Sequence, residues 1–167
     1  MFGRDGNLSI FRVGVIAAII GLLVIVGGIV SFFIDRASHQ VPLEIEVFPG
    51  AVTWGQRTHS NTSRTVYYQV PGVSAEEIAA FYQRKMDAFY PADVERELRE
   101  CKRAPQVGNF PEFDAGVQGV PPYQYSCMFD RSGFQSSQFT RVNIQPGIES
   151  NGTAGTTIIE YQQIWQS

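Results

Sequence analysis

The chain has 167 residues, with 13 basic and 16 acidic side chains and a formal net charge of −3 at neutral pH. This length allows one domain with a short appendage, and the slight acidic excess gives no electrostatic basis for binding nucleic acid. Two cysteines and two histidines are too few for a disulfide-dense scaffold, a four-cysteine zinc site or an iron–sulfur cluster. We therefore expect this chain to hold no metal and no cofactor of its own.

An uncharged apolar run of 22 residues, 13–34, lies between Arg12 and Asp35. As a helix rising ~1.5 Å per residue, the run is ~33 Å long, which matches a hydrocarbon core of ~30 Å. We expect an uncleaved, single-pass transmembrane helix. One alternative is a buried core helix. The other is a signal peptide, whose apolar core is shorter, at ~7–15 residues, and is followed by small residues at the cleavage site.

The charges on either side of this run predict its orientation. Arg4 and Arg12 precede it, and Arg36 is the only basic residue close behind it. Basic residues collect on the cytoplasmic side of membrane helices, so the narrow difference predicts a cytoplasmic tail at residues 1–12. After a connector at residues 35–40, the rest of the chain then lies on the periplasmic or equivalent side of the inner membrane.

Small residues recur along one side of the predicted membrane helix. This glycine seam consists of Gly14, Ala17, Gly21 and Gly28. In lipid, helices associate where small side chains let their backbones approach closely. The seam predicts a contact with a helix of another membrane subunit; the alternative is that glycine is simply common in membrane helices.

Residues 41–167 form the predicted extracytoplasmic domain. Alternating apolar residues predict a strand at 43–47, with Leu, Ile and Val facing inward, and a second strand at 65–70. Ser74 and Glu77 form a capping box at the start of an amphipathic helix, which ends before a proline at position 91.

Three further strands are predicted after this helix, while the stretch at residues 93–101 stays ambiguous between a second helix and a loop. The predicted strands are residues 123–130, 139–144 and 156–165. This order of elements predicts an α+β domain, with an antiparallel sheet covered on one face by one or two helices.

Cys101 and Cys127 are the only cysteines. In an extracytoplasmic domain, a lone pair is more often a structural disulfide than two free thiols. On the chain-entropy account, closing the loop between them stabilises the fold by roughly 3–4 kcal/mol.

A long segment rich in proline and glycine, residues 104–122, lies within the loop that this disulfide would close. It carries four large apolar residues: Phe110, Phe113, Val117 and Val120. Loops of more than ~12–15 residues are uncommon in compact domains and are often binding elements. Two interpretations stay open: these side chains enter the domain's own core, or they form a docking loop for a neighbouring subunit.

The sequence contains no recognised catalytic motif. His39 and His59 lie in polar segments without a neighbouring ligand or nucleophile, and we expect solvated imidazoles. No nucleophile elbow, phosphate loop or calcium loop is present. We therefore expect no catalytic residue, although a site assembled from scattered residues would leave no motif, and an unrecognised enzyme is the third possibility.

Three segments together resemble a bacterial extracytoplasmic module. They read Val-Phe-Pro-Gly-Ala at residues 47–51, Arg-Thr-Val-Tyr-Tyr at 64–68 and Val-Ser-Ala-Glu-Glu-Ile-Ala-Ala-Phe-Tyr at 73–82. The module has a strand that ends in a turn, a second strand and a capped helix. The resemblance covers about residues 43–90 and carries no catalytic signature.

The whole layout also resembles the small, single-pass, cofactor-free accessory subunits of bacterial electron-transfer complexes, most specifically alternative complex III. This resemblance implies a non-catalytic structural subunit of a quinol-oxidising assembly whose cofactors belong to other subunits. Its partners would be membrane subunits, reached through the glycine seam and the 104–122 loop, and the lipid bilayer. The alternative function is a membrane-tethered extracytoplasmic module that binds a small ligand or peptide.

Overall fold

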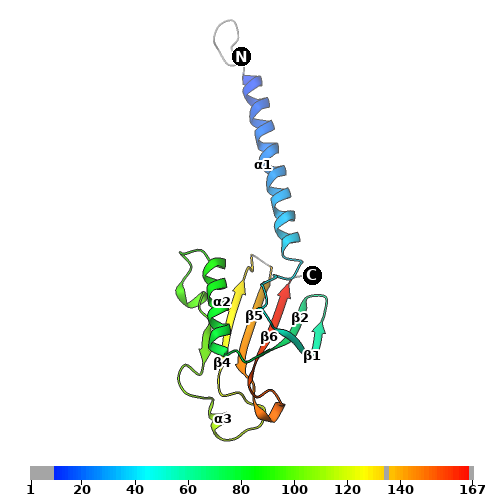
Figure 1. Cartoon of the computed structure of the whole chain (residues 1–167). Coiled ribbons are helices and arrows are strands. Elements are labelled where there is room, and N and C mark those ends of the chain that lie inside the picture. The colour runs from blue at the N-terminus through cyan, green and yellow to red at the C-terminus, as the bar shows by residue number, and fades with distance from the viewer. Residues whose placement is uncertain (1–9, 134–135, 166–167) are drawn as a thin grey trace. The chain divides into compact units, whose positions relative to one another are not determined.

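The computed structural model describes residues 10–133 and 136–165 (Figure 1). The chain divides into two compact units, and the division falls between Ser38 and His39. The first unit contains one helix, and the second contains the sheet and the remaining helices. This second unit is the predicted α+β domain.

Helix α1, Ile10–Ser38, is long and apolar enough to cross a membrane. Every side chain at residues 11–37 is exposed, which differs from a core helix, whose side chains are mostly buried. The helix continues to Ser38, so residues 35–38 of the predicted connector are helical. Residues 1–9 of the predicted tail lie outside the described residues.

The second unit contains a six-stranded antiparallel sheet with the order β1-β2-β6-β5-β4-β3. The strands are β1 Val52–His59, β2 Ser63–Pro71, β3 Lys102–Ala104, β4 Gln124–Asp130, β5 Gln138–Pro146 and β6 Thr156–Trp165. The four inner strands confirm the predicted segments within a few residues at each end. The turn between β4 and β5 includes residues 134–135, which lie outside the described residues.

Both edge strands were missing from the sequence prediction. Every residue of β1 is exposed, so its sequence shows no alternation between apolar and polar residues. Its pairing with β2 is also irregular between Trp54 and Thr58, where Gly55 has a φ of +74°; glycine adopts this conformation easily. β3 has three residues, too few for a recognisable pattern.

Helix α2, Ala75–Phe89, confirms the predicted amphipathic helix. The Ser74 hydroxyl accepts a hydrogen bond from the Glu77 amide at 3.2 Å, as an N-cap does. The helix buries one face, formed by Ala75, Ile78, Ala79, Tyr82 and Met86. That face packs mainly on β4 and β5.

The other helical segments are short. The ambiguous stretch at residues 93–101 contains only the 3₁₀ turn η1, Arg96–Leu98, whose Leu98 side chain is exposed. The long loop contains α3, Pro111–Asp114, and the loop before β6 contains η2, Glu149–Asn151.

The strand predicted at residues 43–47 is wrong in its pairing. Residues 41–48, here called the strap, belong to no helix and to no strand of the sheet. Leu43 is buried, and Ile45 and Val47 pack partly buried against the core, while Glu44 and Glu46 are exposed. The inward pattern was therefore predicted well, but the strap packs with α2 on one face of the sheet instead of adding a strand.

One apolar core lies between the sheet, α2 and the strap. Its buried members are Leu43, Val70, Ala75, Ile78, Ala79, Tyr82, Met86, Cys127, Phe129, Val142, Ile144, Ile159 and Tyr161. The structure contains the Cys101–Cys127 disulfide, with an S–S distance of 2.04 Å. The bond joins the residue before β3 to the centre of β4, so it attaches the start of the long loop to the core.

Candidate functional site

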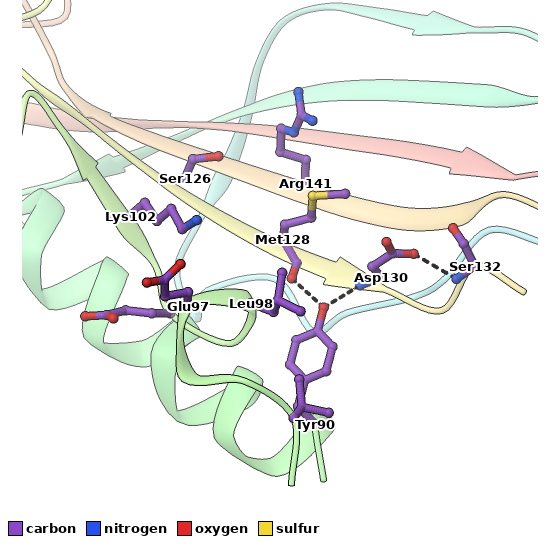
Figure 2. Close-up of a pocket in the computed structure, with 11 residues that line it drawn as sticks. Tyr90, Glu97, Leu98, Lys102, Ser126, Met128, Asp130, Ser132 and Arg141 are labelled. Atoms are coloured by element: carbon purple, nitrogen blue, oxygen red, sulfur yellow. Dashed lines mark hydrogen bonds between the residues drawn. The ribbon is translucent and has the colours of Figure 1, made fainter. Parts of the chain in front are cut away.

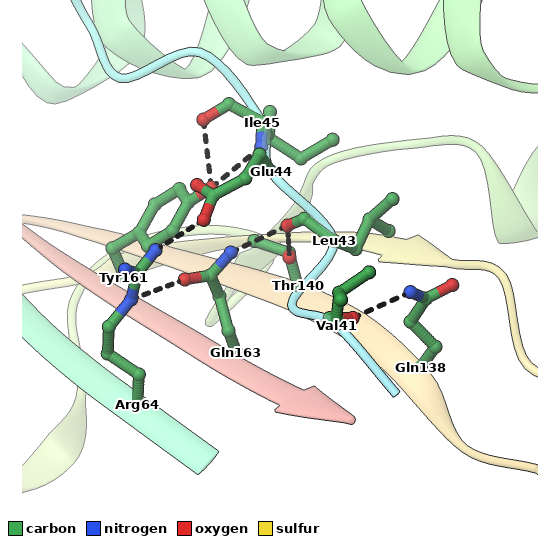
Figure 3. A network of polar contacts seen from close by, with 9 residues as sticks. All are labelled: Val41, Leu43, Glu44, Ile45, Arg64, Gln138, Thr140, Tyr161 and Gln163. Atoms are coloured by element: carbon green, nitrogen blue, oxygen red, sulfur yellow. Dashed lines mark hydrogen bonds and ion pairs between the residues drawn. The ribbon is translucent and has the colours of Figure 1, made fainter. Parts of the chain in front are cut away.

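Buried polar side chains of the sheet hold the strap by its backbone (Figure 3). The Leu43 carbonyl accepts hydrogen bonds from Thr140 Oγ1 at 2.5 Å and from Gln163 Nε2 at 2.6 Å. Gln138 Nε2 donates to the Val41 carbonyl at 2.8 Å. These three side chains are buried, and they supply the hydrogen bonds that a neighbouring strand would otherwise supply.

Two tyrosine hydroxyls complete this network. Tyr161 accepts a hydrogen bond from the Ile45 amide and donates one to the Ile45 carbonyl, each at 2.8 Å. The Tyr82 hydroxyl accepts from the Phe48 amide at 3.2 Å. Burial raises the pKa of Tyr161 to about 12 and also raises the pKa of Tyr82, because an ionised phenol would lose its water here.

The outward side chains of the strap form ion pairs at its margins. Glu44 Oε1 pairs with Arg64 Nη2 at 2.8 Å, and Glu46 pairs with Lys85 of α2. Arg64 Nε also donates to Gln163 Oε1 at 2.7 Å, which links this pair to the buried network. Pairs this exposed contribute little stability, so the buried network carries most of the attachment.

The two histidines differ in burial, and only His59 agrees with the expectation of a solvated imidazole. His39, at the entrance to the strap, is buried, and its Nε2 lies 2.9 Å from the Arg131 carbonyl. The prediction of a solvated imidazole is wrong for this residue, because the chain turns back over the end of β4. His59 is exposed on the edge strand β1.

A pocket of about 490 Å³ lies at the edge of β4 (Figure 2). β3 pairs only with the first part of β4, and Tyr90 occupies the edge beyond it: its hydroxyl donates to the Met128 carbonyl at 2.8 Å and accepts from the Asp130 amide at 2.7 Å. Acidic and basic side chains both line the pocket. The charged residues are Glu97, Glu100, Asp130, Lys102 and Arg141.

The four candidate docking residues of the long loop differ in burial. Phe110 and Val120 are partly buried, whereas Phe113 and Val117 are 37% and 50% exposed. The Phe110 amide donates to the Pro122 carbonyl at 2.7 Å, which closes the base of the loop. None of the four is among the described side chains that form the apolar core or pack against it, and the docking interpretation stays a prediction.

Three of these residues, Phe113, Val117 and Val120, line a hollow of about 440 Å³. Its second wall is the segment 147–155 before β6. We call this feature the loop hollow. It lies at the end of the sheet where β4 begins, whereas His39 lies at the end where β4 finishes.

The residues of the glycine seam all lie in α1 and are exposed. Seven residues rotate a helix to within ~20° of the starting direction, so Gly14, Gly21 and Gly28 share one face. A Cβ atom placed at any of these glycines meets no atom of the chain within 4 Å. Within the described residues, this face is open to another helix.

The fold and these surfaces define a class of protein: an α+β domain with a six-stranded antiparallel sheet, preceded by an apolar helix long enough to cross a membrane. No protein-family model, curated protein or solved structure matches the chain. Among residues 10–133 and 136–165, no group of three His, Cys, Asp or Glu side chains is placed to hold a metal ion.

Sequence reasoning missed the strap network and the pocket beside β4. A usable signal existed for the network, because Gln138 and Thr140 stand in the same alternating phase as Val142 and Ile144 of the predicted strand. Polar residues in the inward phase of a buried strand need hydrogen-bond partners. The pocket depends on where β3 begins, because only the part of β4 before Met128 has β3 beside it, and the sequence contains no signal for this.

Proposed function

We propose that this chain is a non-catalytic, membrane-anchored accessory subunit of a larger membrane protein complex. The observation that carries this proposal is α1, which exposes every side chain at residues 11–37, including the whole glycine seam. An apolar helix of this length is stable in lipid, and a face of small residues is suited to close packing against a second helix.

The domain's chemistry supports an extracytoplasmic location. A disulfide between Cys101 and Cys127 persists in oxidising compartments and is rare in the cytosol. In this proposal the helix is an uncleaved anchor in the inner membrane. The balance of Arg4 and Arg12 against Arg36 supports the proposed orientation, with the amino terminus in the cytoplasm and the domain in the periplasm.

The kind of complex is proposed from the sequence resemblance alone. Single-pass accessory subunits of bacterial electron-transfer complexes share this layout of one helix and one cofactor-free domain. We propose a quinol-oxidising complex of a respiratory or photosynthetic chain, and alternative complex III most specifically. The cofactors would then belong to other subunits, and this chain would brace the extracytoplasmic side.

A matched pair of helix variants tests the accessory-subunit proposal. Gly21→Leu fills the glycine seam, whereas Gly27→Leu makes the same change about 100° around the helix from Gly28, away from the seam. We expect Gly21→Leu to release the chain from its complex during mild detergent purification and Gly27→Leu to leave it bound. Equal co-purification of partners with both variants would contradict a role for the seam.

A second candidate function is a membrane-tethered binding module for a small ligand or peptide. The pocket at the edge of β4 favours it, because acidic and basic side chains lie together beside a partly unpaired strand. If the purified chain is a monomer that carries a small molecule, and Arg141→Ala releases that molecule, this candidate replaces the first.

A further inference from the structure

We propose that the loop hollow receives an apolar side chain flanked by Lys or Arg, on an extracytoplasmic segment of a partner subunit. This inference rests on the proposed function and identifies the chemistry of one contact in the complex. The argument has three parts: the shape of the hollow, its charge and the rigidity of its walls.

The hollow has the size and lining of a recognition site. Its volume of about 440 Å³ lies within the range of ~300–1,000 Å³ typical of ligand pockets. The apolar side chains that line it are Phe113, Val117, Val120, Pro122 and Ile148. Two of them, Phe113 and Val117, are exposed although they share one concavity, and an inserted apolar side chain would remove both from water.

The charged side chains in the two segments that form the hollow are all acidic. The two segments that form it, residues 105–122 and 147–155, contain Glu112, Asp114 and Glu149 but no Lys, Arg or His. Glu149 lines the hollow, Glu112 and Asp114 stand on either side of its lining residue Phe113 in the sequence, and all three acidic residues are exposed. A negative rim favours partners with Lys or Arg beside the apolar side chain and disfavours acidic ones.

An arginine just before the loop is held by hydrogen bonds to the loop's own backbone. Arg103, in β3, donates to the Pro105 carbonyl and, at 2.9 Å, to the Gly108 carbonyl. Its guanidinium carbon lies 4.3 Å from the centre of the Tyr123 ring. Arg103 is therefore held at the root of the loop, and it is not among the residues that line the hollow.

Hydrogen bonds fix both walls before any partner binds. The Val117 amide donates to the Glu112 carbonyl at 2.9 Å, and the Gly119 amide donates across the hollow to Ser150 Oγ at 3.3 Å. In the second wall, a Cβ atom at Gly147 would lie 1.9 Å from the Thr153 carbonyl oxygen, so only glycine lets this segment close. A preformed wall lowers the entropic cost of binding.

Photocrosslinking of the full chain in the membranes of its own host tests the proposal. A benzophenone side chain replaces Val117, which lines the hollow. As a matched control it replaces Val107, which is 88% exposed in the same loop and does not line the hollow. We expect a discrete adduct from position 117 and a several-fold lower yield from position 107. Mass spectrometry of the adduct should identify a partner peptide with an apolar residue beside Lys or Arg.

The salt dependence of the crosslinking yield tests whether the acidic residues contribute to binding. The adduct from position 117 should fall several-fold between ~0.1 M and ~1 M salt, over which the Debye length shrinks from ~10 Å to ~3 Å. It should fall similarly in the variant Glu112→Gln, Asp114→Asn, Glu149→Gln. A salt-independent adduct, an adduct to an acidic segment, or equal yields from both positions would overturn the proposal.

A third probe position separates failure of this inference from failure of the proposed function. A crosslinker at Ala17, in the glycine seam, reports on the membrane contact alone. An adduct from Ala17 without one from position 117 overturns the loop hollow as a docking site and leaves the accessory-subunit proposal standing. No adduct from either position, together with a monomeric native mass, overturns both.

Discussion

The strap, which lies on one face of the sheet, and the loop hollow, which lies at one end of it, differ in which side chains they bury and which they expose. At the strap, polar side chains such as Thr140 and Gln163 are buried to hold the chain's own backbone. At the hollow, apolar side chains such as Val117 stay exposed. Burying a polar group is costly unless it is hydrogen-bonded, so the strap region is organised for stability. The hollow gains no such stability, and its apolar surface is available for contact with a partner.

The largest expected effect concerns the disulfide, which connects the two regions by attaching the start of the long loop to the core. We expect the double variant Cys101→Ala, Cys127→Ala to lose about 3–4 kcal/mol of unfolding free energy, because the unfolded chain regains loop entropy. Urea unfolding of the full chain in detergent micelles, followed by tryptophan fluorescence, measures this loss. An unfolding midpoint that does not change upon reduction of the wild-type chain would contradict it.

Alkaline pH should destabilise the domain partly through the strap tyrosines, because burial also raises the pKa values of Tyr67, Tyr90 and Tyr123 outside the strap. The folded-state pKa of Tyr161 is raised to about 12, and that of Tyr82 is also raised, from a model-compound value of 10.0. The folded state therefore holds these protons more tightly than the unfolded state does. For Tyr161, the stabilisation is complete below pH 10 and is lost as the pH rises from about 10 to 12, by at most about 1.4 kcal/mol per pH unit. Urea unfolding at a series of pH values tests this slope, and Tyr161→Phe should reduce it.

Removing a single tyrosine hydroxyl compares the stability contributed by the strap network with that contributed by the opposite face of the sheet. Tyr161→Phe leaves the amide and carbonyl of Ile45 without this partner, and we expect a loss of about 1.5–2 kcal/mol. Tyr67→Phe is the matched control, because the Tyr67 hydroxyl donates to Glu160 at 3.1 Å on the partly buried opposite face. Its loss should be about 0.5–1 kcal/mol. A larger loss for Tyr67→Phe would show that the strap bonds are not the stronger set.

The smallest effect is expected at the hollow. Val117→Ser should change the unfolding free energy by less than about 0.5 kcal/mol, because the residue is half exposed. The same urea titration measures it. A loss as large as that of Tyr161→Phe would mean that the hollow wall belongs to the core and is not a free surface.

Much of the fold was predictable because the inner strands and α2 each bury one face. β2, β4, β5, β6 and α2 alternate or repeat with the period of their element, and this periodicity is visible in the sequence. The exposed edge strand β1 has no such pattern. The strap shows the limit of this reasoning: alternation reports which residues point inward, but it does not report whether the backbone pairs with a strand or is held by side chains.

The candidate sites were predictable to a smaller extent. The glycine seam and the 104–122 loop follow from residue types along the chain. The loop hollow also needs the segment 147–155, which the fold brings beside the loop from a distant part of the sequence. No sequence pattern in either segment predicts that the two lie side by side. The hollow and its acidic residues can therefore be identified only in the folded domain.

The most direct test of the central claim is the native mass of the full chain after gentle detergent extraction from its own membranes. The account predicts a complex well above the 18.6 kDa of the chain, containing other membrane subunits and dissociated by Gly21→Leu. A stable monomer of the wild-type chain would contradict the accessory-subunit proposal.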